Sequence, residues 1–305
     1  MRRLITGFML SISILAVLLT VGCTSTSGAP SGVGSGGSST VLEKKPWYEA
    51  LTPADEPINI LLVGGDNQSD NPGDRSDAIM LIRLSPSTRE VWMMTLPRDA
   101  KVPGYLKLNA SYSHKGFPGL EKSVYGLTGF RPDYRIKVGF DGLVKVIDEL
   151  GGIDIDNPEA ISDRKADASP GKKYSKIPAG PQHLNGYQAL TFLRTRSGLA
   201  GEYGRQKRHR IFVEAMLKKI FSVDAIESIP AVVKTAKENI WTDMSTSDIL
   251  RYAFAFNGER RVYSSQPNGV WRSPSVYLDK AETRGLAKDM LSGKPFRKVE
   301  DKGSF

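Results

Sequence analysis

Carboxylates and arginines gather at three places in the first third of the sequence. Asp66 stands alone, Arg75 precedes Asp77 by two residues, and Arg98 is followed directly by Asp99. Carboxylate oxygens are good ligands for Mg²⁺, and arginine side chains bind phosphate oxygens through paired N–H groups. This mixture of charges predicts a site for a divalent cation together with a phosphate-bearing ligand.

A second group of cationic residues lies further along the chain. Arg194 and Arg196 are separated by one residue, and Arg205 and Arg208 by two. In an extended segment the first two would point to the same face, and on a helix the second two would be neighbours. Near a helix start, cations meet the positive end of the helix dipole, which is unfavourable unless a phosphate binds there. A solvated basic face, partly neutralised by Glu202, is the alternative interpretation.

Strands are expected to position the first group. Three runs rich in β-branched or aromatic residues predict strands at 59–63, 78–84 and 91–96. A turn signal at 85–88 makes the second and third runs an antiparallel pair. If the first two runs are antiparallel as well, Asp66, Asp77 and Asp99 lie at one end of one sheet.

The rest of the chain mixes both kinds of element. Helices are predicted at 120–128, 143–150 (ended by two glycines), 186–192 (capped by Asn185), 208–221, within 224–257 (with Ser245 as a cap) and 281–291, and strands at 134–140, 153–156, 261–264 and 276–278. The polar stretch 157–183 is rich in proline and glycine, which predicts a functional loop or a disordered insertion. The whole pattern predicts an α/β fold, a central mixed β-sheet flanked by helices on both faces in an α-β-α sandwich.

The N-terminus predicts export. Two arginines precede an uncharged apolar run that ends at Cys23, the single cysteine of the chain. Residues 1–23 are therefore a signal with a lipoprotein processing site, which we favour, or an uncleaved membrane anchor. Residues 24–46 are a flexible Ser/Gly linker, and 47–305 form the globular part. We expect this part to be tethered on the extracytoplasmic face of the cell membrane, within the cell envelope.

Composition narrows the classes of partner. The net charge is +9 and the pI about 9.4, which suits nucleic acid, anionic lipid or a polyanionic substrate. Export and the absence of any nucleic-acid motif argue against nucleic acid. No order of residues typical of a Ser-His-Asp triad is visible, and His114, His183 and His209 are expected to be surface or structural residues. A single cysteine excludes internal disulfides and thiolate metal sites.

Residues 58–220 resemble the LytR-CpsA-Psr family of cell-wall glycopolymer transferases. An opening strand ending at Asp66 is followed by five segments in the order that the family shows, namely RSDAIML at 75–81, LPRD at 96–99, KLNA at 107–110, DELGGI at 148–153 and LNGYQAL at 184–190, the last leading into Arg194 and Arg196. The match covers about half of the chain. One departure is His209, which stands where the family normally has glutamine and introduces a group that can titrate.

The resemblance implies a role for each matching residue. Asp66 and Asp77 would bind Mg²⁺ between pyrophosphate oxygens, and Asp99 would orient Arg98 or help to position the metal or the acceptor. Six arginines would hold the pyrophosphate of a polyprenyl-diphosphate-linked glycan: Arg75, Arg98, Arg194, Arg196, Arg205 and Arg208. The reaction would transfer a glycopolymer phosphate to a peptidoglycan hydroxyl, leaving a phosphodiester and a polyprenyl phosphate.

Such a transfer needs positioning and charge neutralisation, not a covalent enzyme intermediate. We expect an acidic residue, Asp66 or Asp99, to assist removal of the acceptor proton. The polyprenyl chain would need an apolar groove between sheet and helices, although an ordinary core explains the same helix residues. Two alternatives stay open: a non-catalytic protein that binds a lipid diphosphate or wall polymer, and a hydrolase that releases the same substrate to water.

Overall fold

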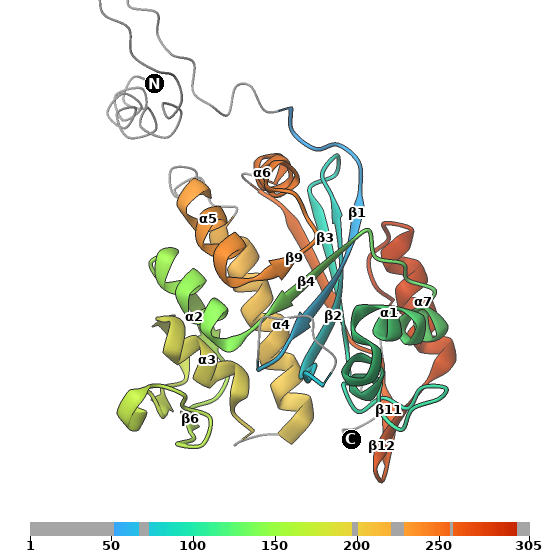
Figure 1. The fold of residues 1–305 in the computed structure, drawn as a ribbon, viewed down its shortest axis with the longest axis horizontal. Helices are drawn as coiled ribbons and strands as arrows, with labels where there is room; N and C mark the ends of the chain where they lie inside the picture. The colour runs from blue at the N-terminus through green and yellow to red at the C-terminus, as the bar shows by residue number, and fades with distance from the viewer. Residues whose placement is uncertain (1–51, 67–72, 197–200, 221–228, 257–258, 298–305) are drawn as a thin grey trace, which may run out of the picture. The chain divides into compact units, whose positions relative to one another are not determined.

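A mixed six-stranded β-sheet runs through the centre of the computed structural model, which describes residues 52–66, 73–196, 201–220, 229–256 and 259–297 (Figure 1). The strand order is β10-β3-β2-β1-β4-β9. The strands are β1 (Ile58–Gly64), β2 (Ala78–Ser85), β3 (Glu90–Leu96), β4 (Tyr134–Val138), β9 (Trp241–Thr242) and β10 (Arg261–Ser265). The expected export segment, residues 1–23, and the expected linker, 24–46, lie outside the described residues.

The three strands predicted first are confirmed, together with their pairing. β2 is antiparallel to both β1 and β3, whereas β4 runs parallel to β1. Gly64 at the end of β1 lies opposite Ala78 at the start of β2, and Leu96 at the end of β3 lies opposite Ile79. The sheet therefore brings Asp66, Asp77 and the 97–99 segment to one end.

Helices cover both faces of this sheet, as the predicted α-β-α sandwich requires (Figure 1). One face carries α1 (Leu108–Thr128) and α7 (Lys280–Leu291), whose buried residues pack on the side that contains Leu61 and Met94. The other face carries α5 (Ile229–Asn239), α6 (Thr246–Ala255) and part of α4 (Gly201–Ile220), which pack around Met80 and Met93. Apolar side chains point to both faces, so the strands are buried on both sides.

A smaller apolar cluster supports the second group of arginines. It joins α2 (Phe140–Glu149), α3 (Gly186–Arg194), β5 (Ile153–Asn157) and β8 (Gly180–Leu184) to α4 through buried residues such as Ile147, Phe192 and Phe212. Asn185 caps α3 as predicted, because its side chain accepts from the backbone N–H of Gln188 at 3.0 Å. The cluster fixes where α3 ends and where α4 runs.

Two helices begin earlier than predicted. α1 starts at Leu108 instead of residue 120. Its N-cap residue, Lys107, makes no side-chain cap hydrogen bond, so the sequence contains no capping residue that marks this start. A kink at Gly116, where φ is 58°, separates the predicted half from the missed half. α4 starts at Gly201 instead of residue 208, which places Arg205 and Arg208 in its second turn.

Other elements also differ from expectation. The stretch 157–183 is ordered and contains β6 (Ile161–Ser162), η3 (Pro170–Lys172), β7 (Lys176–Ile177) and the start of β8, so the prediction of a disordered insertion was wrong. The two-residue β9 and the strand β11 (Gly269–Arg272), which forms a hairpin with β12 (Ser275–Leu278), were not predicted. None of the helices in the described ranges combines the length and apolar character needed to cross a membrane.

Candidate active site

Asp66, Arg75 and Asp77 form one continuous set of charges at the end of the sheet. The Nη2 atom of Arg75 lies 3.1 Å from Oδ2 of Asp66 and 3.7 Å from Oδ2 of Asp77. The side chains of Arg75 and Asp66 are 61% and 42% exposed, whereas that of Asp77 is 19% exposed. A cationic group therefore sits between two carboxylates that the sequence had assigned to one site.

Arg98 extends this set into the interior. Its Nη1 atom makes an ion pair with Oδ1 of Asp77, and its Nε lies 3.7 Å from Oδ2 of Asp99. Lys107 holds the other oxygen of Asp99, with Nζ to Oδ1 at 2.8 Å. Asp99 thus lies between two cations, Arg98 and Lys107, and Arg98 links it to Asp77.

Tight backbone contacts fix the segment that carries Arg75 and Asp77. The Asp77 N–H donates to the carbonyl of Gly64 at 2.8 Å, and the Gly65 N–H donates to Val138 of β4 at 3.1 Å. A Cβ atom on Gly65 would lie 2.2 Å from the Arg75 carbonyl oxygen, which is too close for two non-bonded atoms. The backbone at residue 65 or residue 75 would have to shift. Residue 65 is therefore glycine because the returning chain passes directly against it.

A buried ion pair lies beneath this segment. Lys137 of β4 is fully buried, and its Nζ donates to Oδ2 of Asp74 at 2.7 Å. The same Nζ lies 5.0 Å from the ring centroid of Tyr112, which is also fully buried. Ser113 adds a hydrogen bond from its hydroxyl to the Asp74 carbonyl at 2.9 Å. Asp74 thereby ties the segment before Arg75 to both β4 and α1.

Sequence reasoning missed Lys137. Alternation along the predicted strand 134–140 puts Lys137 between apolar neighbours, where a lysine is expected to face water. Asp74, the partner of Lys137, was the one hint in the sequence. It is an acidic residue next to Arg75 to which no role was assigned from the sequence, so a buried cationic partner could have been suspected. Lys107 belonged to a recognised segment but likewise had no assigned contact.

The second arginine group is positioned by a turn far away in sequence. Arg194 is the last residue of α3, so the condition under which it would share a face with Arg196, an extended segment, is not met. The hydroxyl of Thr195 donates to Oδ2 of Asp163 at 2.8 Å, and the Arg196 N–H donates to the same oxygen at 3.4 Å. Nη1 of Arg194 donates to the carbonyl of Ala166 at 3.1 Å. The turn at 163–166 therefore clamps the segment that presents both arginines.

The electrostatics of Asp163 agree with this clamp. Burial acts to raise the pKa of Asp163, but hydrogen bonds from Thr195 and from the backbone N–H groups of Ala166, Arg196 and Lys165 outweigh it and lower the pKa. The carboxyl is therefore held as an acceptor-only carboxylate, which suits its contacts.

Arg205 and Arg208 lie on α4 and are almost completely buried, each 4% exposed. Nη2 of Arg208 donates to the Thr195 carbonyl at 2.6 Å, so α4 is joined to the segment that Asp163 clamps. His209 lies close enough to Arg205, Arg208 and Asp77 to be affected by the charge of each. α4 also packs against β3, the strand that leads into Arg98. A freely solvated basic face does not fit buried arginines.

His209 does not introduce a titrating group at neutral pH. Desolvation of the fully buried ring and the charge of Arg205 lower the pKa of His209 to about 3, although the Leu193 carbonyl and Asp77 act in the opposite direction. The Nε2 atom lies 3.1 Å from the Leu193 carbonyl oxygen, so this nitrogen carries the proton and donates. His209 is thus a neutral hydrogen-bond donor, like the glutamine that it replaces.

We predict a measurable consequence for stability. The unfolded state takes up a proton on His209 below pH about 6.5, whereas the folded state does so only near pH 3, so stability falls as the pH is lowered through this window. H209Q should remove the contribution of His209 to the decrease in the free energy of unfolding with falling pH. The free energy of unfolding of both proteins, measured by urea titration from pH about 7 to about 4, checks it. Parallel curves would show that His209 is protonated in the fold.

The acidic residues suit a magnesium ion only together with a ligand. Within the described ranges, no three acidic, histidine or cysteine side chains gather as a metal site. Asp66 and Asp77 do face one cationic group, the Arg75 guanidinium, from two sides. Two carboxylates completed by phosphate oxygens and water are a common arrangement for Mg²⁺. The donor set therefore fits this ion.

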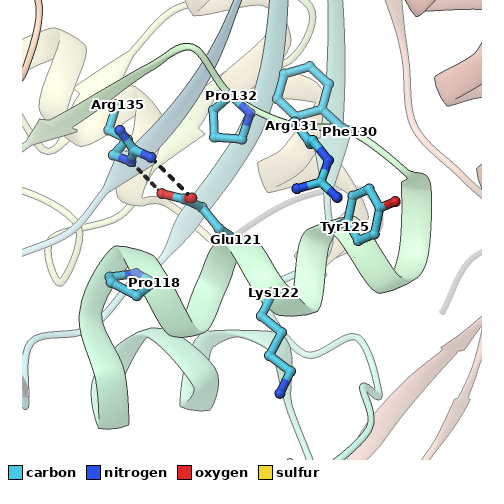
Figure 2. Close-up of a pocket in the computed structure, with 8 residues that line it drawn as sticks. All are labelled: Pro118, Glu121, Lys122, Tyr125, Phe130, Arg131, Pro132 and Arg135. Atoms are coloured by element: carbon cyan, nitrogen blue, oxygen red, sulfur yellow. Dashed lines mark hydrogen bonds and ion pairs between the residues drawn. The ribbon is translucent and has the colours of Figure 1, made fainter.

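A separate surface depression does not share these residues (Figure 2). It has a volume of about 530 Å³ and is lined by Pro118, Glu121, Lys122, Tyr125, Phe130, Arg131, Pro132 and Arg135. Arg135 is paired with Glu121, and the Arg131 guanidinium lies 4.0 Å from the ring centroid of Tyr125. The depression shares no residue with the group formed by Asp66, Arg75, Asp77, Arg98 and Asp99, which we call the carboxylate–arginine cluster. Of the two, only this cluster contains residues that the sequence singled out, so it is the better candidate for chemistry.

Comparison with known proteins places this geometry in context. Residues 34–286 match the model of the LytR_cpsA_psr family. The polyisoprenyl-teichoic acid--peptidoglycan teichoic acid transferase TagV of Bacillus subtilis (strain 168) is 30% identical over 220 residues, which are 69% of this chain and 56% of that protein. The corresponding transferase TagU of Bacillus mycoides (strain KBAB4) is 32% identical over 196 residues, 62% of this chain and 61% of that protein. The chain thus spans less than two thirds of the length of these relatives.

A solved structure agrees with the sequence comparison. The crystal structure of B. subtilis TagV superposes with a TM-score of 0.66 and 26% sequence identity. The superposition covers 78% of this chain and 98% of that chain. The α/β sandwich described above is therefore shared with that protein.

Proposed function

Because the chain belongs to the LytR_cpsA_psr family, we propose that it transfers a glycopolymer phosphate from a polyprenyl-diphosphate-linked donor to a peptidoglycan hydroxyl. The relatives TagV and TagU carry the name of teichoic acid transferases that act on peptidoglycan. The observation that carries the proposal is the packing of α4, which bears Arg205 and Arg208, against β3, the strand that leads into Arg98 and its ion pair with Asp77.

The arginines would bind the diphosphate. Arg205 and Arg208 are fixed by burial and Arg98 by its ion pair with Asp77, whereas Arg75 and Arg196 are exposed and would reach a ligand from outside. Guanidinium groups held before the substrate arrives stabilise charge that develops on phosphate oxygens without a cost of reorganisation.

Asp66 and Asp77 would hold Mg²⁺, which when bound would neutralise charge on the diphosphate. The Arg75 guanidinium, which now lies between the two carboxylates, would turn toward the phosphate oxygens. Its exposed side chain has room for this movement.

In the reaction the acceptor oxygen attacks the phosphorus that carries the glycan. The bond from this phosphorus to the polyprenyl phosphate breaks, polyprenyl phosphate leaves, and the acceptor proton passes to a base. Asp99 is enclosed by Arg98 and Lys107, which favours a positioning role. Asp66 is 42% exposed and is the remaining candidate for the base, with one carboxylate oxygen for the metal and the other for the acceptor proton.

A transfer assay tests the proposal. The full chain in liposomes is incubated with a lipid-linked diphosphate glycan, peptidoglycan and Mg²⁺, and the products are separated by mass. We expect a phosphodiester-linked product together with one polyprenyl phosphate per transfer, and loss of both when the metal is removed with a chelator. Release of glycan phosphate to water would identify a hydrolase instead. Binding of the donor without any product would identify a binding protein.

A further inference from the structure

Exposed apolar side chains are concentrated around one hairpin. Within the described residues, four of the five exposed large hydrophobic side chains lie here, and we call them the hairpin patch: Leu106, Val270, Trp271 and Tyr277, with exposed fractions of 59%, 57%, 45% and 44%. The last three belong to the β11–β12 hairpin, and the Ser275 hydroxyl of that hairpin donates to the Leu106 carbonyl at 2.6 Å. A patch of this kind marks an interaction site.

The hairpin exposes apolar side chains on both of its faces. Val270 and Tyr277 are direct cross-strand partners and therefore share one face. Trp271 is paired with Val276 on the other face, where Val276 is buried and Trp271 is not. Such a hairpin projects into its surroundings, and Figure 1 shows it at the end of the molecule toward which β1 runs.

Cations accompany the aromatic rings of the patch. Nζ of Lys107 lies 5.9 Å from the ring centroid of Trp271, and the Arg272 guanidinium lies 5.5 Å from that of Tyr277. Trp and Tyr beside Lys and Arg are the residues enriched at a membrane–water interface. The aliphatic side chains of Leu106 and Val270 have no polar group for sugar hydroxyls, which favours a lipid surface over a glycan.

The hairpin patch is continuous with the candidate active site. The Val276 N–H donates to the Asp99 carbonyl at 2.8 Å, and the Lys101 N–H donates to the Val276 carbonyl at 2.8 Å. Lys107 joins the two regions directly, because the same ammonium group contacts Asp99 and lies near Trp271. A surface on which the patch rests would therefore lie at the edge of the carboxylate–arginine cluster.

We propose that the hairpin patch docks on the anionic surface of the membrane that holds the donor. The inference rests on the proposed function, because the diphosphate of a lipid-linked donor lies at the depth of the lipid headgroups. Trp271, Tyr277 and the aliphatic side chains enter the interface, while Lys107 and Arg272 remain at the headgroups. The net charge is +9 for the full chain and +7 after removal of residues 1–22, and in both cases it adds attraction to anionic lipid.

Fluorescence quenching tests the docking. The full chain is reconstituted into liposomes of anionic phospholipid, with and without brominated acyl chains, and tryptophan emission is recorded. We expect brominated lipid to quench the wild type and W271F to lose most of that quenching. The matched control adds Y125W to W271F, since Tyr125 is exposed to a similar degree, 46%, in the separate depression of Figure 2. If the N-terminal segment alone holds the protein on the liposome, Trp271 and the tryptophan introduced at position 125 should be quenched to the same extent.

Two results would overturn the inference. One is quenching that is unchanged by W271F, or that is equally strong at Tyr125→Trp. The other is a change of Trp271 emission caused by peptidoglycan fragments and not by brominated lipid, which would make the hairpin a glycan surface. If Trp271 is quenched but the transfer assay gives no product, the proposed function fails while the docking stands.

Discussion

R98A is expected to reduce the rate of glycopolymer transfer by about 10²- to 10³-fold, the usual cost of removing a preorganised group that stabilises developing charge. Arg98 is the side chain that joins Asp77 to Asp99, and it is held in place by both. Its loss removes a fixed positive charge from the site. It also leaves the carboxylates of Asp77 and Asp99 without the cation that lies between them, so that they repel each other. The initial rate of product formation in the liposome assay measures the effect.

R131A is the matched control for this variant. Arg131 is exposed and stacks on Tyr125 in the separate depression, so its removal should leave the transfer rate unchanged. R98K retains the charge but not the planar fork, and an intermediate rate would attribute part of the effect to bidentate binding. Thermal unfolding of each variant excludes misfolding as the cause. Equal rates for R98A and R131A would contradict the assignment of Arg98.

D74N is expected to lower the free energy of unfolding by about 3–5 kcal/mol, as for other buried ion pairs that lose one charged partner. The Lys137 ammonium is fully buried and contacts the Asp74 carboxylate at 2.7 Å, so the variant removes a charge that stabilises this ammonium. Because the same segment continues into Arg75 and Asp77, transfer should fall as well. Urea unfolding monitored by circular dichroism gives the free energy.

D154N provides the comparison on the surface. Asp154 is 81% exposed and pairs with His183 at 2.7 Å, and an exposed pair of this kind contributes about 0–1 kcal/mol. The two variants make the same chemical change, in a buried pair with Lys137 and in an exposed pair with His183. If D74N is no less stable than D154N, the Lys137–Asp74 pair does not hold the segment in place.

The framework of the sheet was predictable because its signals are local. Strands β1, β2 and β3 are short apolar runs separated by a turn or a polar segment, and their order in sequence is their order in the sheet. Asp66, Asp77 and Arg98 lie at one end of the sheet because β2 is antiparallel to both β1 and β3. Asn185 and Ser245 were likewise visible as caps, since a cap acts on its own helix.

The missed features depend on contacts between distant parts of the chain or lack a local signal. Lys137 faces inward because Asp74, 63 residues earlier, supplies a carboxylate, and no strand pattern reports such a partner. Asp163 acts on Thr195 across 32 residues. The start of α1 was missed because no cap side chain announces it, and β9 is only two residues long.

The two edge strands of the sheet determine how readily copies of the protein could aggregate through edge-to-edge strand pairing. An open edge strand offers unpaired N–H and C=O groups to any neighbouring chain. One edge here is β9, which has only two residues and leaves little to pair with. The other edge is β10, where the exposed Arg261 is linked to Glu90 and places charge along the border. Both borders therefore resist the growth of a continuous sheet from one molecule to the next.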